Sequence, residues 1–200
     1  GYEEDFLDQV SEALDYAAGS NPELRQAVIA ALLRMLYLDR DGRAVSPLFT
    51  WLDARAARSR GEGISSAREL ELATGYPVSP RFGLATHYHN QTEELVPEGA
   101  AALCTIMDYL ARRLTGGGHA GSSAADGRTT RDSAPGGPCT DPTNGASLGV
   151  FDLERSDFDR EALGRAGVEL SMLPRVVPSG TVIGRYGDGI PVTVPLGDNQ

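Results

Sequence analysis

A long segment rich in glycine, serine and proline interrupts the chain between Gly116 and Pro138, with the sequence GGGHAGSSAADGRTTRDSAPGGP. Such a composition buries too little apolar surface to offset the entropy of ordering the chain. The segment is also longer than the roughly 15 residues that loops in compact domains rarely exceed. Residues 117–138 are therefore predicted to be a disordered insertion. The ordered structure has to come from residues 1–116 and 139–200.

The composition indicates one soluble globular domain. The chain has 200 residues, of which 40% are hydrophobic, and a formal net charge of -10. No apolar stretch approaches the roughly 18 residues that span a bilayer, and the first residues do not resemble a signal peptide. The two cysteines, Cys104 and Cys139, suit a reducing compartment better than a disulfide framework. The sequence thus predicts a cytoplasmic protein with no membrane partner.

The basic residues argue against a nucleic-acid partner. All 18 are arginines, they are scattered along the chain, and 28 acidic residues outnumber them. A protein that binds nucleic acid usually gathers its basic residues into a patch that neutralises phosphates. No such patch is evident in the sequence.

Apolar spacing predicts helices alternating with strands. Helices are expected over residues 3–18, 67–74, 98–114 and 159–167, and the stretch LDARAARSR after the tryptophan has helical character. A hairpin is expected around the turn DRDGR, a loop at GEGISS, a strand over 145–153, and short strands in the tail after residue 170. Residues 27–38 fit either a helix or a buried strand, and residues 81–90 are ambiguous. This alternation is typical of an α/β domain.

Asp198 is a candidate catalytic residue because it follows the apolar run PVTVPL. In open α/β sheets, ligands gather beyond the carboxyl ends of the strands. Gly197 would allow close approach to the backbone, and Asn199 adds an amide that can bind hydroxyls. The sequence G-D-N is also a common turn, and on spacing alone the turn is the preferred interpretation.

Trp51, the only tryptophan, is followed by Asp53 and Arg55. An exposed indole can cover the apolar face of a sugar, while a carboxylate and a guanidinium bind its hydroxyls. A buried tryptophan beside a structural ion pair is the alternative, and it is preferred on these residues alone. His87 and His89 lack further ligands at a spacing typical of metal sites, so no metal site is predicted.

Five stretches in order resemble the FGGY family of carbohydrate kinases. The residues concerned are LDRDGRAVSPLFTWLDARA, IMDYLARRLTG, TDPTNGASLGVFDL, FDREALGRAGVELSMLPRVVPSGTVIG and IPVTVPLGDNQ. The variants P-L-F-T-W, A-T-G-Y and G-D-N-Q are similar to those of the sedoheptulokinase-like and xylulokinase-like branches. Almost the whole chain outside the glycine-rich segment takes part in the resemblance.

The resemblance implies a ribonuclease H-like (actin-like ATPase) domain with a mixed sheet flanked by helices. Residues 1–200 would be part of the amino-terminal domain of a kinase that transfers the γ-phosphate of ATP to a sugar, such as the ketoses sedoheptulose or xylulose. Asp198 would be the catalytic base, and Trp51, Asp53, Arg55 and Asn199 would lie at the sugar. ATP and Mg²⁺ would be bound mostly by segments outside this chain. A homodimer is left open, and the fragment alone is expected to be inactive.

Two other functions stay open at this point. The stretch ALLR at residues 31–34 stands where relatives have a polar segment such as Q-M-H-G, so that Leu33 replaces a histidine. This difference favours a degenerate, non-catalytic sugar-binding or scaffold protein of the same fold. A metal-dependent hydrolase that uses His87 and His89 is the third possibility.

Overall fold

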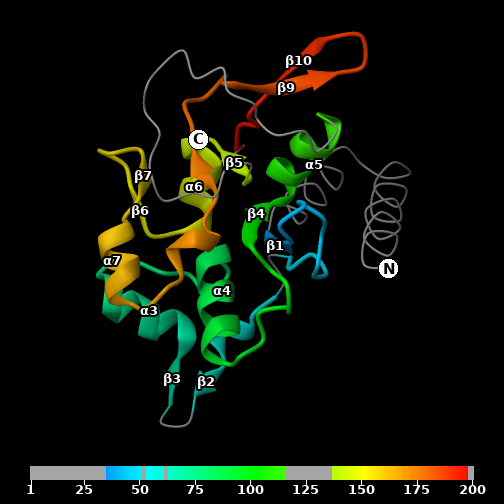
Figure 1. Ribbon diagram of the computed structural model, residues 1–200. Helices are drawn as coiled ribbons and strands as arrows, with labels where there is room; N and C mark the ends of the chain where they lie inside the picture. Colours follow the sequence, from blue (N-terminus) through cyan, green and yellow to red (C-terminus); the bar gives the residue numbers. More distant parts are fainter. Residues whose placement is uncertain (1–34, 51–52, 61–62, 116–136, 198–200) are drawn as a thin grey trace, which may run out of the picture.

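The computed structural model describes residues 35–50, 53–60, 63–115 and 137–197. The expected helix at 3–18, residues 27–34 and nearly all of the glycine-rich segment lie outside the described residues. The described part alternates helices and strands, which confirms the α/β prediction (Figure 1). Within it, no helix has both the length and the apolar character that a membrane crossing requires.

A buried pair of antiparallel strands lies at the centre. Strand β1 (Met35–Leu38) pairs with β4 (Ala102–Thr105), and every residue of both strands is buried. The strand interpretation of residues 27–38 is therefore confirmed for its described part. The single helix predicted over 98–114 is wrong in its first half. An apolar run that is buried on all sides fits a helical spacing and a strand equally well, and pairing with β1 decides between them.

Helix α5 (Ile106–Leu114) begins directly after β4 because Thr105 caps it. The Thr105 hydroxyl accepts from the Asp108 backbone amide at 3.2 Å, and the Asp108 carboxylate accepts from the Thr105 amide at 3.3 Å. This reciprocal capping box satisfies amides that the helix itself leaves unpaired.

The hairpin expected around DRDGR is confirmed, although its second arm is irregular. Asp39 accepts backbone hydrogen bonds from Asp41 and Arg43, and Gly42 takes a positive φ of 80°. The second arm meets β1 only at isolated bridges, Leu38 to Ala44 and Met35 to Phe49.

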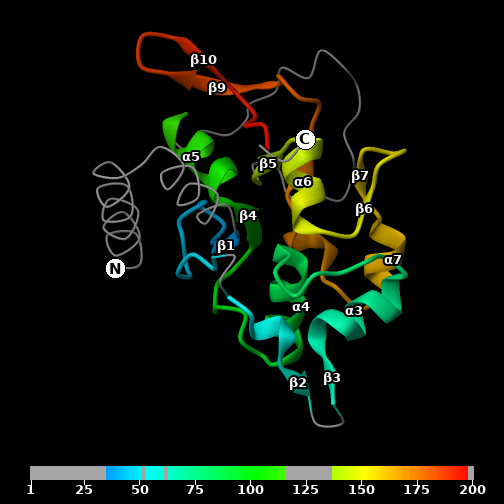
Figure 2. The same ribbon diagram turned by 180° about the vertical axis from the view of Figure 1, so that it is seen from behind.

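Helix α4 (Gly83–Thr92) lies beside the β1–β4 pair, and a group of further helices lies beyond it (Figure 2). This group contains α3 (Ser66–Thr74) and the short 3-10 helix η1 (Arg55–Ala57), which contact each other and α4. Helix α7 (Arg160–Arg165) packs on α3. The helices predicted at 67–74 and 159–167 are confirmed, and the ambiguous stretch 81–90 proves helical from Gly83 onward. The expected GEGISS loop is shorter than predicted, because β2 (Ser59–Arg60) and β3 (Ile64–Ser65) form a hairpin around it.

The remaining elements follow the glycine-rich segment. Strand β5 (Cys139–Thr140) leads into α6 (Pro142–Leu148), and β6 (Phe151–Asp152) pairs with β7 (Asp157–Phe158). The strand predicted over 145–153 is therefore wrong up to residue 148. Asp141 caps a helix there and Pro142 occupies its first turn, a pattern that favours helix initiation.

Short strands in the tail are confirmed. After the 3-10 helix η2 (Leu170–Met172), β8 (Arg175–Val176) runs parallel to β5, and β9 (Val182–Tyr186) forms an antiparallel hairpin with β10 (Ile190–Thr193). The β9–β10 hairpin lies above α5 in Figure 1. In the described residues, strands pair two by two, both antiparallel and parallel.

Candidate functional site

The structure describes only some of the residues that are predicted to form the sugar site. Trp51, Asp198 and Asn199 lie outside the described residues, and so does Leu33. Asp53, Arg55 and Gly197 are described. Two regions of the described structure therefore bear on the site. One is the Asp53–Arg55 pair, and the other is the segment that ends at Gly197, directly before Asp198.

Asp53 and Arg55 form a two-pronged ion pair. The Arg55 Nε lies 3.0 Å from both Asp53 carboxylate oxygens, and its Nη2 lies 2.9 Å from Asp53 Oδ2. The guanidinium also stacks on the Phe49 ring, 4.4 Å from its centroid. Stacking and a bidentate pair fix the planar Arg55 head more firmly than a single contact would. Both side chains remain partly exposed, at 18% for Asp53 and 27% for Arg55.

A chain of buried hydrogen bonds connects Arg55 to the core. Arg55 Nη1 donates to Asn90 Oδ1 at 2.8 Å, and Asn90 Nδ2 donates to the Tyr37 hydroxyl at 3.2 Å. Tyr37 in turn is hydrogen-bonded to His87 Nδ1 at 2.9 Å. Strand β1 and helix α4 thus orient the ion pair that follows the hairpin. The sequence did not single out Tyr37 or Asn90, because nothing local distinguishes them from ordinary core and surface residues.

Burial keeps Tyr37 and His87, the two members of this chain nearest the core, uncharged at neutral pH. It raises the pKa of Tyr37 to about 12 and lowers the pKa of His87 to about 4. The Tyr37 hydroxyl accepts from Asn90 Nδ2 and shares a second hydrogen bond with His87 Nδ1, whereas His87 Nε2 is buried and has no hydrogen-bond partner among the described residues.

His87 and His89 have different partners. His87 contacts Tyr37 on β1, while His89 Nδ1 is hydrogen-bonded to the Ser66 hydroxyl of α3 at 2.9 Å. Residues two apart on a helix do not face each other. Among the residues that the structure describes, no group of three or more histidine, cysteine, aspartate or glutamate side chains could hold a metal ion. The two histidines bind α4 to its neighbours.

The second region is built around Asp141, which is fully buried. Its Oδ1 accepts from the Asn144 amide at 2.9 Å and from the Thr143 hydroxyl at 2.8 Å, and its Oδ2 accepts from the Ser179 hydroxyl at 2.9 Å. The same helix turn contacts the chain before Asp198, since Thr143 accepts from the Gly197 amide and Asn144 donates to the Pro195 carbonyl. These residues were not predicted from the sequence, although D-P-T-N is typical of a helix start, with Asp141 as the cap and Pro142 in the first turn.

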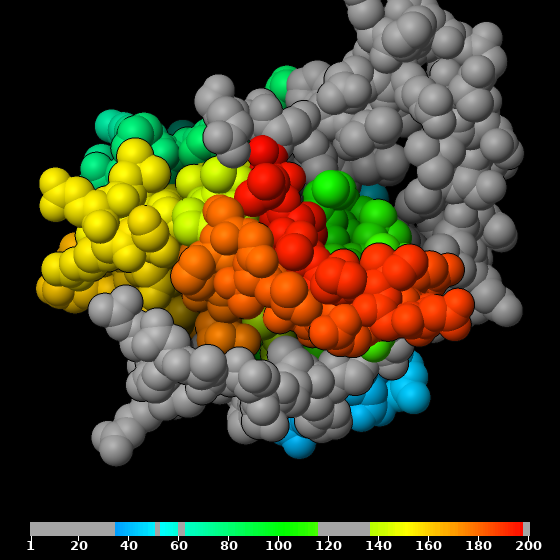
Figure 3. Space-filling view, turned by 90° about the horizontal axis from the view of Figure 1, so that it is seen from above, coloured from blue at the N-terminus to red at the C-terminus, as the bar shows by residue number. Residues whose placement is uncertain are grey.

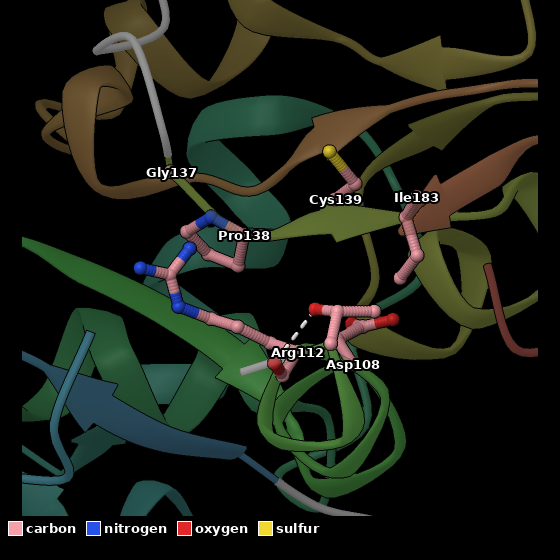
Figure 4. Close-up of a pocket in the computed structure, with 7 residues that line it drawn as sticks. Asp108, Arg112, Gly137, Pro138, Cys139 and Ile183 are labelled. Carbon is pink, nitrogen blue, oxygen red and sulfur yellow. Dashed lines mark hydrogen bonds between the residues drawn. The ribbon is translucent and has the colours of Figure 1, made fainter. Parts of the chain in front are cut away.

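A small pocket lies between α5 and β5 (Figure 4). Its lining residues are Asp108, Arg112, Thr115, Gly137, Pro138, Cys139 and Ile183. The space inside, about 20 Å³, accommodates about one water molecule and no sugar. Burial raises the pKa of the Cys139 and Cys104 thiols, so neither has the lowered pKa of a reactive cysteine.

Asp108 is the most strongly shifted carboxyl group near this pocket. Burial raises its pKa to about 7, although hydrogen bonds from Thr105 lower it in part, and the charge of Asp141 raises it further. The Thr105 hydroxyl donates to Asp108 Oδ2 at 2.8 Å, whereas Oδ1 has no hydrogen-bond partner among the described residues. The folded protein therefore holds a proton on Asp108 at pH values at which the unfolded chain has released it.

This shift predicts that the contribution of Asp108 to stability falls as the pH rises. Between pH about 4 and about 7 the native state binds one more proton at Asp108 than the unfolded state, so its contribution declines by up to about 1.4 kcal/mol per pH unit. Asp108→Asn removes this decline. Urea unfolding of both proteins at each pH measures it, and the contribution of His87, which has the opposite sign, is common to both. An unchanged difference between the two proteins across this range would contradict the prediction.

Known proteins are similar to the chain over most of its length. A family model described as "FGGY family of carbohydrate kinases, N-terminal domain" matches residues 27–197. The glycerol kinase of Thermus brockianus is 31% identical over 199 residues, covering 92% of this chain and 36% of that protein. The xylulose kinase of Streptomyces coelicolor is 30% identical over 179 residues, covering 82% and 33%. The chain thus spans about a third of the length of these relatives.

Solved structures share its fold. A structure described as a "xyloylose kinase from Brucella ovis" superposes with a TM-score of 0.56 at 18% identity, covering 96% of this chain and 38% of that one. The glycerol kinase of Plasmodium falciparum, solved with ADP, gives a TM-score of 0.55 at 18% identity and covers 84% and 33%.

Proposed function

The chain belongs to the FGGY family of carbohydrate kinases and has the ribonuclease H-like, actin-like fold of that family, and from this premise we propose that it is part of the amino-terminal domain of an ATP-dependent sugar kinase. The observation that carries the proposal is the family match over residues 27–197. The substrate proposed is a ketose. Xylulose is supported by the xylulose kinase of Streptomyces coelicolor, which is 30% identical, whereas sedoheptulose rests only on the sequence variants described above.

Asp198 is proposed as the general base. As a hydroxyl oxygen of the sugar attacks the γ-phosphorus of ATP, the Asp198 carboxylate takes the hydroxyl proton, the bond to the β-phosphate oxygen breaks, and ADP leaves. Phosphoryl transfer depends mainly on positioning and on charge stabilisation, with one base to orient the nucleophile. The proposal is supported by the anchored backbone at Gly197, which directly precedes Asp198.

Trp51, Asp53, Arg55 and Asn199 are proposed as sugar-binding residues. The contacts of Asp53 and Arg55 support this role in part, because the pair is rigid and still partly exposed. A carboxylate accepts hydrogen bonds from sugar hydroxyls and a guanidinium donates to them. An ion pair that is already oriented loses less conformational entropy when a ligand binds.

ATP is the proposed phosphoryl donor, and Mg²⁺ is its usual companion in such reactions. The described residues do not fit a magnesium site, because no cluster of three or more candidate ligands occurs among them and the small pocket beside Asp108 is too narrow for a nucleotide. We therefore assign no residue of this chain to the metal. A cytoplasmic location, inferred from two buried free cysteines, also stays a proposal.

A coupled assay of ADP release tests the proposed activity. The complete gene product, supplied with Mg-ATP, is expected to phosphorylate xylulose or sedoheptulose faster than glycerol or gluconate. Calorimetry with the same sugars distinguishes the alternative. Binding of a sugar without turnover would support a non-catalytic sugar-binding protein, which the ALLR stretch favours, and would contradict the kinase proposal.

A further inference from the structure

The first turn of α6 holds the backbone that leads into Asp198. We propose that Thr143 and Asn144 are positioning residues, which fix the course of the chain over Pro195–Gly197 and thereby the place of the Asp198 carboxylate. This inference rests on the proposed function, because it assigns a role to residues that act through the proposed base. Neither side chain needs to touch the substrate.

Two hydrogen bonds connect the helix to this segment. The Gly197 amide donates to the Thr143 hydroxyl at 2.7 Å, and Asn144 Nδ2 donates to the Pro195 carbonyl at 3.0 Å. One bond fixes an amide and the other a carbonyl two residues earlier. Together they define both the position and the orientation of the backbone just before Asp198.

Gly197 lies in direct contact with the helix start. A Cβ atom placed on Gly197 would lie 3.0 Å from the Thr143 hydroxyl and 3.2 and 3.3 Å from Asn144 Oδ1 and its backbone nitrogen. These distances are shorter than ordinary van der Waals contacts, so the glycine permits an approach that a side chain would disturb.

The helix turn is itself firmly placed. Asp141 is fully buried and accepts from Thr143, from the Asn144 amide and from Ser179, while Asn144 is only 3% exposed. Because the Thr143 hydroxyl donates to Asp141, its lone pairs are directed at the Gly197 amide. The buried Asp141 carboxylate thus orients the Thr143 hydroxyl, which accepts the hydrogen bond from the Gly197 amide.

The β9–β10 hairpin supplies little support of its own. It has two strands, and its apolar side chains are largely exposed, with Val182 at 55%, Tyr186 at 52% and Ile190 at 62%. An isolated two-stranded hairpin is marginally stable. Figure 3 shows the residues after it, in red, at the surface between α6 and α5. The segment after the hairpin packs against the rest of the protein from Val194 onward. Val194 is buried, and the residues after it contact α6.

Displacing the base should slow the chemical step. A shift of about 1 Å in a catalytic group can cost on the order of 100-fold in rate. Thr143→Val keeps the branched shape and removes the hydroxyl that binds Gly197. We expect kcat to fall about 10-fold to 100-fold and KM for the sugar to change less, since three of the four proposed sugar-binding residues lie at 51–55 and only Asn199 follows the displaced segment.

The kinetics are measured on the complete gene product, with Thr143→Ser as rescue and Ser147→Ala as matched control. Serine keeps the hydroxyl and should retain kcat to within about threefold. Ser147 lies on the same helix, and its hydroxyl bonds only to the Asn144 carbonyl within that helix, so its removal should leave kcat unchanged. Asn144→Asp is a second variant, which keeps the size of the side chain and loses the donor to Pro195.

Amide hydrogen exchange supplies a readout that needs no activity. The Gly197 amide should exchange at least about 10-fold faster in Thr143→Val than in the wild type, Thr143→Ser or Ser147→Ala. Wild-type kcat in both Thr143→Val and Asn144→Asp would overturn the inference, as would unchanged protection of Gly197. Wild-type kcat in both variants together with an inactive Asp198→Asn would refute the positioning role alone. An active Asp198→Asn would refute the proposed base.

Discussion

Asp198→Asn is expected to lower kcat for sugar phosphorylation by about 100-fold to 10,000-fold, with sugar affinity nearly unchanged. The asparagine amide has almost the same size as the carboxylate and can still hydrogen-bond to a hydroxyl. It cannot accept the proton that the hydroxyl must lose. The rate of ADP release gives kcat, and calorimetry with the same sugar shows whether binding persists.

Asp188→Asn is the matched control for this substitution. Asp188 lies in the turn of the β9–β10 hairpin, where it is exposed, and it receives the same chemical change. It should leave kcat within about twofold of the wild type. If Asp198→Asn were as active as Asp188→Asn, another group would have to be the base.

Asp141→Ala is expected to give the largest loss of stability among the polar substitutions considered. It removes the cap of α6, which contributes about 1 kcal/mol, and leaves the Thr143 and Ser179 hydroxyls without their acceptor. A fully buried unpaired polar group costs about 1–3 kcal/mol, but Thr143 is only partly buried and the exposed Ser179 hydroxyl can bond to water instead. Together these losses predict a decrease of about 1–3 kcal/mol in the free energy of unfolding. Urea denaturation at constant pH measures it from the shift of the midpoint.

Asp159→Ala is the control that measures the cost of losing a helix cap without a buried hydrogen-bond network. Asp159 caps the short helix α7 by accepting from the Ala162 amide at 2.9 Å, and it also accepts from the Tyr76 hydroxyl at 3.0 Å, but it is only partly buried. Its loss should cost about 1 kcal/mol. Equal costs for the two alanine variants would mean that the hydroxyls around Asp141 find other partners and that the network adds nothing to the cap.

Local sequence signals predicted the elements that carry their own start and stop residues. Helix α3 follows Ser65, whose hydroxyl accepts from the Arg68 amide, and it ends at Gly75 with a positive φ of 80°. The turn at Asp39 and Gly42 is similarly determined by its own residues. The errors at 98–105 and 145–148 have another cause. At 98–105, a buried apolar run fits both the spacing of a helix and that of a strand. At 145–148, the apolar residues suggested a strand, although the cap at Asp141 and the proline after it favour a helix.

The candidate site was harder to predict because its contacts are distant in the sequence. Thr143 meets Gly197 across 54 residues, and Arg55 meets Asn90 across 35. No spacing rule connects such positions. The resemblance to the kinase family indicated Asp198, Asp53 and Arg55 as residue types in order, whereas the side chains that orient them became visible only in three dimensions.

The hydrogen-bond chain from His87 through Tyr37 and Asn90 to Arg55 has a consequence for how the protein responds to its surroundings. Neither His87 nor Tyr37 changes its charge between pH about 4 and about 12, because burial moves their pKa values to those limits. Histidine is the side chain that ordinarily titrates near neutral pH. Here it is instead a neutral hydrogen-bonding residue, so the orientation of the Asp53–Arg55 pair is expected not to change with pH over that range.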